Sequence, residues 1–279
     1  MMRFLISMML IMLTTNSYAE LPDHQEWDTL LKRHVSLLRG GQASEVDYAG
    51  MARDHEALQA YLQRISHVSL AQFDLSSTRD QLAFLINAYN AWTVELVLTE
   101  YPNLKSIKDL GGLFRSPWRK EFVVLLGETR SLDDIEHGLI RGSNRYEDPR
   151  IHFAVNCASI GCPALRNEAY SGAKLDDQLQ NQLQFFLSDR SRNRFHNGDL
   201  QVSPIFKWYR EDFERGWMGF QSLQQFFSQH SALLDLSQDE VRRLNTGKME
   251  IEFLDYDWRL NDRADQDAAV VKITDTKIH

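Results

Sequence analysis

The stretch Asp80–Glu100, DQLAFLINAYNAWTVELVLTE, is apolar on nearly every face of a helix. Ser76, Ser77 and Thr78 precede it, and each offers a hydroxyl that can cap a helix N-terminus. Pro102 follows it and closes the helix, because the residue before a proline disfavours helical backbone. A helix that is apolar all round is buried on all sides. We therefore expect this stretch to be the buried central helix of the fold.

Apolar residues at helical spacing predict further helices on both sides of this stretch. On the N-terminal side, a first helix is predicted from the spacing of Trp27, Leu30, Leu31, Val35 and Leu38, and Gly40-Gly41 ends it. A second helix is predicted near 51–65. On the C-terminal side they are Leu175–Leu187, Ile205–Phe213, Ser222–Gln229 and Gln238–Leu244.

Short β-rich runs predict a small sheet beside these helices. The predicted strands are Phe122–Leu126, Arg150–Asn156, Leu200–Ser203 and Glu250–Leu254. Between the first two, Ser131 and Asp134 form a capping box that opens a short helix through Ile140. The sequence therefore predicts an α+β protein, a helix-rich single domain with a small β-sheet.

The N-terminus has the three-part pattern of a secretory signal peptide. Arg3 precedes the apolar run Phe4–Leu13, and small residues end the segment at Ala19. The run is shorter than the roughly 20 residues that span a bilayer, so a retained anchor is the weaker alternative. We expect residues 1–19 to be a signal peptide, 20–262 to be the single globular domain and 263–279 to be a loosely held tail. The protein would then be periplasmic or secreted.

Composition narrows the classes of partner. The net charge of -8 argues against nucleic acid and anionic lipid, because both bind basic surfaces. After signal cleavage we expect no integral membrane segment. The sequence contains no GxSxG, GxxxxGK[ST] or GxGxxG pattern, so we expect no nucleotide cofactor and no serine hydrolase. A small molecule or peptide remains as the expected substrate.

The two cysteines, Cys157 and Cys162, lie five residues apart in RIHFAVNCASIGCPAL. In an exported protein this pair is open to three interpretations: a local disulfide, two buried inert thiols, or a nucleophile at Cys157. If Arg150–Asn156 is a regular strand, Cys157 shares a face with apolar residues, and His152 and Asn156 share the opposite face. That alternation separates His152 from Cys157, and it places the polar face beside a cleft or a polar network.

His137 is then the better candidate for a base. It lies on the short helix after Ser131, and a thiolate nucleophile needs an imidazole within hydrogen-bond reach. Asp133 and Asp134, one turn earlier, are better placed than the adjacent Glu136 to orient it. The alternative is a capping or salt-linked histidine on an exposed helix.

A metal site and a pair of asparagines complete the candidates. Cys157, Cys162, His137 and His152 lack the paired spacing of a metal site, and we expect no metal.

Asn87 and Asn90 share one face of the apolar helix, so both amides need partners. They either hold the backbone of a neighbouring loop or line a site as oxyanion donors or as the third member of a Cys-His-Asn set. The aromatic residues of IFKWYREDFERGW are most simply core packing.

Several segments together resemble the DUF547 family, a domain of unknown function. They are VDYAGM from Val46, FLINAYNAW from Phe84, SLDDIEHGLIR from Ser131, DPRIHFAVNCASIGCPAL from Asp148, IFKWYREDF from Ile205 and FLDYDWRLN from Phe253. The resemblance places Asn87, Asn90, Glu136, His137, His152 and Cys157 at recurrent family positions. It also implies that Cys162 lies where other members have Ser or Asp, which favours a separate role for Cys157.

The leading hypothesis is an exported cysteine-dependent hydrolase or acyl transferase that acts on an amide, a thioester or a small thiol. The predicted catalytic residues are Cys157 as a free nucleophile, His137 as base and Glu136. The predicted substrate-binding residues are Asn87, Asn90, His152 and Asn156. A distant or permuted papain-like or transglutaminase-like core is a further expectation, although His137 precedes Cys157 here.

Two alternatives belong to other classes of protein. The first is a non-catalytic module that binds a peptide or a small molecule in the same cleft. The second is a thiol-redox or glutathione-handling protein in which Cys162 resolves the chemistry of Cys157.

Overall fold

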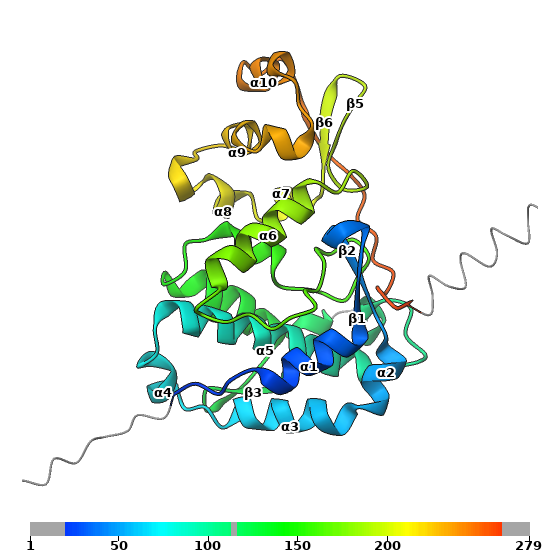
Figure 1. The fold of residues 1–279 in the computed structure, drawn as a ribbon, viewed down its shortest axis with the longest axis vertical. Helices are drawn as coiled ribbons and strands as arrows, with labels where there is room; N and C mark the ends of the chain where they lie inside the picture. Colours follow the sequence, from blue (N-terminus) through cyan, green and yellow to red (C-terminus); the bar gives the residue numbers. More distant parts are fainter. Residues whose placement is uncertain (1–19, 113–115, 264–279) are drawn as a thin grey trace, which may run out of the picture.

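The structure is a computed structural model that describes residues 20–112 and 116–263. The predicted signal peptide at 1–19 lies outside the described residues, and so does the predicted tail after Arg263. Helix α5 (Thr78–Leu98) crosses the half of the molecule that contains α1 (Gln25–His34), α3 (His55–Ser66) and α4 (Leu70–Asp74). Helix α6 (Leu175–Leu187) lies above it in the view of Figure 1. The elements after α6 gather at the opposite end of the molecule (Figure 1).

Helix α5 is the buried centre of the fold, as its composition predicts. Its N-cap is Ser77, whose Oγ accepts a hydrogen bond from the Asp80 amide at 3.2 Å. Its residues from Gln81 to Ala91 are all buried. The helices α1 (Gln25–His34), α2 (Tyr48–Arg53), α3 (His55–Ser66) and α4 (Leu70–Asp74) belong to the same half.

The first predicted helix ends earlier than expected. Its last turn, Val35–Leu38, is strand β1, which pairs antiparallel with β2 (Ala43–Val46). Gly40 and Gly41 have φ of 69° and 100° and form the turn between these strands. The glycines therefore close a hairpin, because left-handed backbone suits a tight turn as well as a helix end.

The helices of the second half match the prediction except at one break. They are α6 (Leu175–Leu187), α7 (Ile205–Trp208), α8 (Arg210–Glu214), α9 (Leu223–Gln229) and α10 (Gln238–Asn245). The expected continuous helix Ile205–Phe213 is interrupted at Tyr209, where φ is -112° and ψ is 23°.

Two further small sheets accompany the hairpin of β1 and β2. Strands β3 (Val123–Leu125) and β4 (Glu128–Arg130) form a second antiparallel pair. Strands β5 (Arg194–His196), β6 (Asp199–Val202) and β7 (Ile251–Phe253) form the third sheet, in which β6 pairs parallel with β7. The helix-rich α+β class is confirmed.

Short 3-10 and π helices make up the remaining regular structure. They are η1 (Arg39–Gly41), η2 (Ile107–Leu110), η3 (Pro117–Arg119), the π-helix η4 (Asp134–Ile140), η5 (Arg141–Ser143), η6 (Pro149–Phe153), η7 (Trp217–Gly219) and η8 (Ser231–Leu234). The capping box before η4 is confirmed: the Ser131 amide donates to Asp134 Oδ2 at 2.8 Å, and the Asp134 amide donates to Ser131 Oγ at 3.1 Å.

The predicted strand Arg150–Asn156 is wrong, because this segment contains the helix η6. Asp148 caps η6 by accepting a hydrogen bond from the Arg150 amide at 3.0 Å, and Pro149 occupies its first turn. An Asx cap followed by proline starts helical backbone. The strand alternation that separated His152 from Cys157 therefore does not exist.

The core consists of two hydrophobic clusters. One surrounds α5 and extends to Leu132 and Ile135 beside η4. The other is rich in phenylalanine and includes Phe153, Phe206 and Phe213. Core packing is thus confirmed for Phe206 and Phe213 of the predicted aromatic cluster, but it is wrong for Trp208, which is 47% exposed.

The segment 154–172 is largely buried yet has neither helix nor ladder hydrogen bonds along most of its length. Buried backbone groups need partners, and here side chains supply them. Asn87 Nδ2 donates to the Tyr170 carbonyl at 2.8 Å, and Asn87 Oδ1 accepts from the Tyr170 amide at 2.9 Å. Gln182 of α6 donates to the carbonyls of Phe153 and Ala164. Amides on α5 and α6 therefore hold this segment from two sides.

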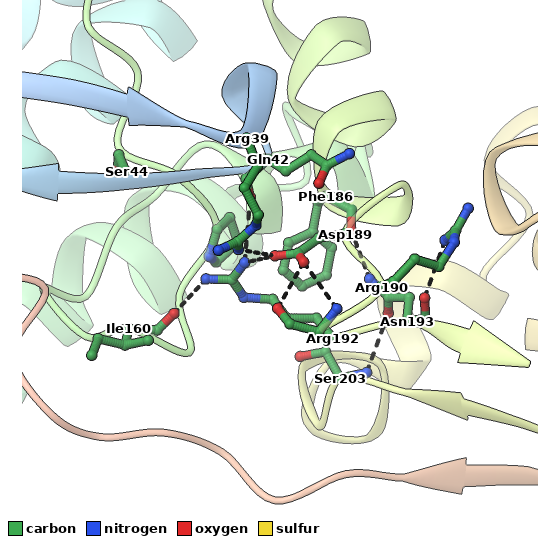
Figure 2. Close-up of polar contacts among 12 residues, drawn as sticks. Arg39, Gln42, Ser44, Ile160, Phe186, Asp189, Arg190, Arg192, Asn193 and Ser203 are labelled. Carbon is green, nitrogen blue, oxygen red and sulfur yellow. Dashed lines mark hydrogen bonds and ion pairs between the residues drawn. The ribbon is translucent and has the colours of Figure 1, made fainter. Parts of the chain in front are cut away.

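A buried carboxylate, Asp189, joins the end of α6 to the same segment (Figure 2). It pairs with Arg192 and, at 2.9 Å, with Arg39, and Arg192 also donates to the carbonyl of Ile160. Burial opposes ionisation of Asp189, but Arg192 and the hydrogen bonds from Ser191 hold the pKa of Asp189 below its usual range. The loop between the two cysteines is thus bound to an ion-pair network.

Replacing Asn87 with Ala is expected to lower the free energy of unfolding by about 3 kcal/mol. The substitution leaves two buried backbone groups of Tyr170 without partners, and each such group costs roughly 1–3 kcal/mol. Urea denaturation followed by circular dichroism measures the change. Asn103→Ala, at an exposed position, is the control and should change stability by no more than about 0.5 kcal/mol. A loss below about 1 kcal/mol for Asn87→Ala would show that this clamp does not support the fold.

Candidate functional site

A cavity of about 190 Å³ lies where η4, η6, α7 and the segment 256–258 meet. Trp and Tyr rings form a large part of its walls, and its polar side chains include both of the predicted histidines. The lining residues are Tyr89, Trp118, Asp133, Glu136, His137, His152, Val155, Cys157, Cys162, Pro163, Ile205, Trp208, Tyr209, Tyr256 and Trp258. The structure therefore brings Glu136, His137, His152 and Cys157 to one cavity, as the hypothesis of a shared site requires.

Cys157 is joined to Cys162 by a disulfide in this structure. The expectation of a free thiol at Cys157 is therefore not met in this state, and the local disulfide, one of the three interpretations of the pair, is the one observed. Cys157 is partly exposed, whereas Cys162 is buried. Cys157 Sγ lies 3.1 Å from the Tyr256 hydroxyl and 3.2 Å from the Ser159 hydroxyl.

The loop that carries the disulfide is fixed by backbone contacts. The amides of Ile160 and Gly161 donate to the carbonyls of Arg259 and Asp257. The Cys157 amide donates to Cys162 Sγ at 2.8 Å. These contacts set the direction of Cys157 independently of regular secondary structure.

His152 forms a pair with Asp212, a residue that sequence analysis did not single out. His152 Nε2 lies 2.7 Å from Asp212 Oδ2, and the His152 ring stacks on Tyr209 with 3.8 Å between ring centroids. His152 Nδ1 is buried and has no hydrogen-bond partner. Nε2 therefore donates to the carboxylate, and Nδ1 carries the lone pair of a neutral imidazole.

The protonation states of this pair follow from burial and from the hydrogen bond. Burial lowers the pKa of His152 below its ordinary value, although Asp212 acts in the opposite direction. Burial disfavours ionisation of Asp212, but the hydrogen bonds from His152 and Arg141 hold its pKa well below the usual range. His152 is therefore a neutral base next to an ionised carboxylate.

Asp212 is also tied to two arginines. Arg141 Nε donates to Asp212 Oδ2 at 2.6 Å, and Arg215 pairs with Asp212 Oδ1. The sequence holds one hint of this role, because Asp212 falls in the segment IFKWYREDF that resembles the family. Nothing in the spacing links a residue at 212 to one at 152.

His137 lies at the rim of the cavity. Its side chain is 43% exposed, and its Nε2 is 3.9 Å from Asp133 Oδ1. Its Nδ1 lies 2.8 Å from Arg141 Nη1. Asp133 thus occupies the predicted orienting position, whereas the carboxylate of Asp134 accepts hydrogen bonds from Ser131 instead.

Glu136 lies deeper than His137, and only 5% of its surface is exposed. Its Oε1 is buried without a hydrogen-bond partner. Burial and the Glu136 carboxylate both raise the pKa of Tyr89 and of Tyr209, so these phenols stay protonated. The cavity therefore contains one carboxylate oxygen that is open to a donor.

Asn87, Asn90 and Asn156 lie outside the lining of this cavity. Asn90 Nδ2 donates to the Ala154 carbonyl at 2.9 Å, and Asn90 Oδ1 accepts from the Asn156 amide at 2.8 Å. The Asn156 side chain donates to the Pro163 carbonyl at 2.8 Å. These amides hold backbone, as the structural alternative for Asn87 and Asn90 expects, and the structure gives them positioning roles.

The described parts of the chain limit two other kinds of function. Within 20–112 and 116–263, no group of three or more His, Cys, Asp or Glu side chains is arranged to hold a metal ion. Across the same ranges, no helix combines the length and the apolar character needed to cross a membrane.

The pKa of His152 gives a direct test of this geometry. Nuclear magnetic resonance titration of its ring protons should place its pKa below the ordinary value of about 6.5, so that the ring is neutral at pH 7. Asp212→Asn should lower the pKa further, because the carboxylate favours the protonated ring. Asp235→Asn, which removes an exposed carboxylate paired with Arg190, should leave it unchanged. A rise in the pKa in Asp212→Asn would contradict the assigned contact.

Comparison with known proteins places the cavity in a recognised segment. Residues 73–187 match the model of a family described as "Protein of unknown function, DUF547". No curated protein and no solved structure matches the chain at a significant level. The matched range contains Glu136, His152 and both cysteines, whereas Asp212 and Tyr256 follow it. The resemblance to DUF547 is confirmed over residues 73–187, the range that carries the disulfide and most of the cavity wall.

Proposed function

We propose that this protein is a cysteine-dependent enzyme that cleaves or transfers an acyl group from an amide or a thioester. Cys157 is the nucleophile once its disulfide with Cys162 is reduced, and His152 is the base. The observation that supports this proposal most directly is the unpartnered Nδ1 of His152, in a cavity that Cys157 also lines, with Asp212 bound to the opposite ring nitrogen.

His152 suits the role of base better than His137. A catalytic imidazole needs a third group that fixes its tautomer, and Asp212 does this at 2.7 Å. The His137 side chain is 43% exposed, and its Nε2 is 3.9 Å from Asp133 Oδ1, which is too far for a hydrogen bond. Its Nδ1 contacts Arg141, so no carboxylate fixes this ring as Asp212 fixes His152. We therefore move the proposed role of base from His137 to His152.

The reaction proceeds in two half-reactions. His152 Nδ1 takes the proton of the Cys157 thiol, and the sulfur attacks the substrate carbonyl carbon to form a C–S bond. The bond from that carbon to the leaving nitrogen or sulfur breaks, and the imidazolium returns the proton to the leaving group. Water or an acceptor nucleophile, deprotonated by His152, then attacks the thioester and releases Cys157.

The Tyr256 hydroxyl is the proposed donor to the oxyanion. It lies 3.1 Å from Cys157 Sγ, and burial raises the pKa of Tyr256, so the phenol keeps its proton. A donor close to the attacking sulfur can stabilise charge as it develops on the carbonyl oxygen. This role replaces the one proposed for Asn87 and Asn90, whose amides bind backbone.

Thiol–disulfide exchange is the second candidate function. The observation in its favour is the Cys157 amide, which donates to Cys162 Sγ and would stabilise Cys162 as a leaving thiolate. An external thiolate would attack Cys157 Sγ, the bond between the two cysteines would break, and a second substrate thiol would release the first as a disulfide. In this scheme both cysteines are essential.

Two other expectations stay predictions. Export to the periplasm or outside the cell rests on the N-terminal pattern, and the papain-like or transglutaminase-like core rests on the resemblance. The proposed chemistry requires neither. The non-catalytic binding module shares the same cavity and differs only in the absence of turnover.

Thioester cleavage by cysteine variants tests the proposal. With S-phenyl thioesters of small amino acids as probes and a phosphine as reductant, the wild-type protein should release thiophenol only after reduction. Cys162→Ser should be active without reductant, Cys157→Ser should be inactive, and His152→Ala should lose at least about a hundredfold in kcat.

The same variants separate the alternatives. Oxidation of a dithiol that needs both cysteines, without thioester cleavage, would replace the proposed function with thiol–disulfide exchange. Binding of the probes without any turnover by reduced wild-type protein or Cys162→Ser would leave the binding module.

A further inference from the structure

The charged residues that line the cavity are acidic. Glu136 and Asp133 contribute carboxylates, and no Lys or Arg is among the lining residues in the part of the chain that the structure describes. Two arginines lie nearby: Arg119 Nε pairs with Asp133 Oδ2 at 3.1 Å, and the Arg141 guanidinium is bound to Asp212 and contacts His137. Glu136 therefore carries the negative charge that a ligand would meet. An anionic group would therefore meet like charge here, whereas a cation would meet opposite charge.

The aromatic rings strengthen this preference. Trp208, Tyr256 and Trp258 form a continuous group, with ring centroids 4.9 Å apart for Trp208 and Tyr256 and 4.5 Å apart for Tyr256 and Trp258. The faces of such rings attract cations. Lys108 Nζ stands 3.6 Å from the centroid of a Trp258 ring, so this indole already takes part in a cation–π contact.

Glu136 carries the second, independent observation. Its Oε1 has no hydrogen-bond partner, although only 5% of the surface of Glu136 is exposed. A buried carboxylate oxygen without a donor is costly, and native structures usually satisfy such groups. The Tyr89 and Tyr209 hydroxyls hydrogen-bond to the Glu136 carboxylate, yet Oε1 is without a partner. A ligand donor would satisfy this oxygen.

We infer that the cavity binds a substrate with a protonated amine, whose ammonium donates to Glu136 Oε1 and packs against the aromatic wall. This inference rests on the proposed function, because it names the class of substrate for the same site. The acyl group presented to Cys157 then belongs to a small amino-acyl amide or thioester. The volume of about 190 Å³ corresponds to roughly six water molecules, which suits a single amino-acyl group.

Binding can be measured without catalysis. Cys157→Ser protein is titrated with leucinamide, with N-acetylleucinamide as the neutral match and with succinamate as the anionic one. Tryptophan fluorescence from the cavity wall and calorimetry report the affinities. Leucinamide should bind at least about tenfold more tightly than N-acetylleucinamide, as expected for a charge-assisted hydrogen bond, and succinamate should bind most weakly.

Glu136→Gln should abolish the preference for leucinamide and leave the affinity for N-acetylleucinamide within about twofold. Glu147→Gln, at an exposed position outside the lining, is the matched control and should keep the preference. Equal affinity for the two amides, tighter binding of succinamate, or an unchanged preference in Glu136→Gln would overturn the inference.

The outcomes separate this inference from the proposed function. If Cys157 cleaves thioesters but the amine preference is absent, the inference about the substrate is wrong and the proposed function stands. If the amine preference is present but reduced protein cleaves no thioester, the cavity recognises amines and the proposed chemistry is wrong.

Discussion

The need to satisfy buried backbone in an irregular segment governs this structure. Residues 154–172 pass through the interior largely without ladder or helix hydrogen bonds. Side-chain amides on two flanking helices take the place of that regular pairing, with Asn87 and Asn90 on α5 and Gln182 on α6. Asn87 and Asn90 each donate and accept, and Gln182 donates twice, so a few residues hold several backbone groups. This explains why a helix that is apolar on nearly every face contains buried asparagines.

The same clamps position the candidate site. Asn90 binds the backbone on either side of Val155, Asn156 shapes the next turn, and Arg192 binds the loop between the cysteines from the other side. Cys157 and His152 therefore belong to a segment whose backbone is fixed by buried contacts. A reactive pair gains from such rigidity, because small displacements of a nucleophile or a base are costly for catalysis. The disulfide adds a chemical state, since the proposed nucleophile Cys157 has a free thiol only after reduction.

Sequence analysis predicted the parts of the fold that depend on local signals. The apolar character of Asp80–Glu100 identified the central helix, and the Ser131 capping box identified the start of η4. It failed where one pattern supports two structures. The alternation in Arg150–Asn156 resembled a strand, but the cap at Asp148 and the proline after it start a helical turn, which changes the direction of His152. The partnership of His152 with Asp212 joins residues 60 positions apart, and only the packing of α8 against η6 brings them together.

The central claim is that Cys157 is activated by His152. In reduced Cys162→Ser protein, the ultraviolet absorbance of the thiolate as a function of pH gives the pKa of Cys157 directly. Transfer of the Cys157 proton to neutral His152 forms a thiolate–imidazolium pair, so the account predicts thiolate absorbance at pH values well below the ordinary pKa of about 8.5, and a return toward that value when His152 is also replaced by alanine. A thiol that titrates at about 8.5 or above in both proteins would contradict the account, because its sulfur would then be no more reactive than a free cysteine.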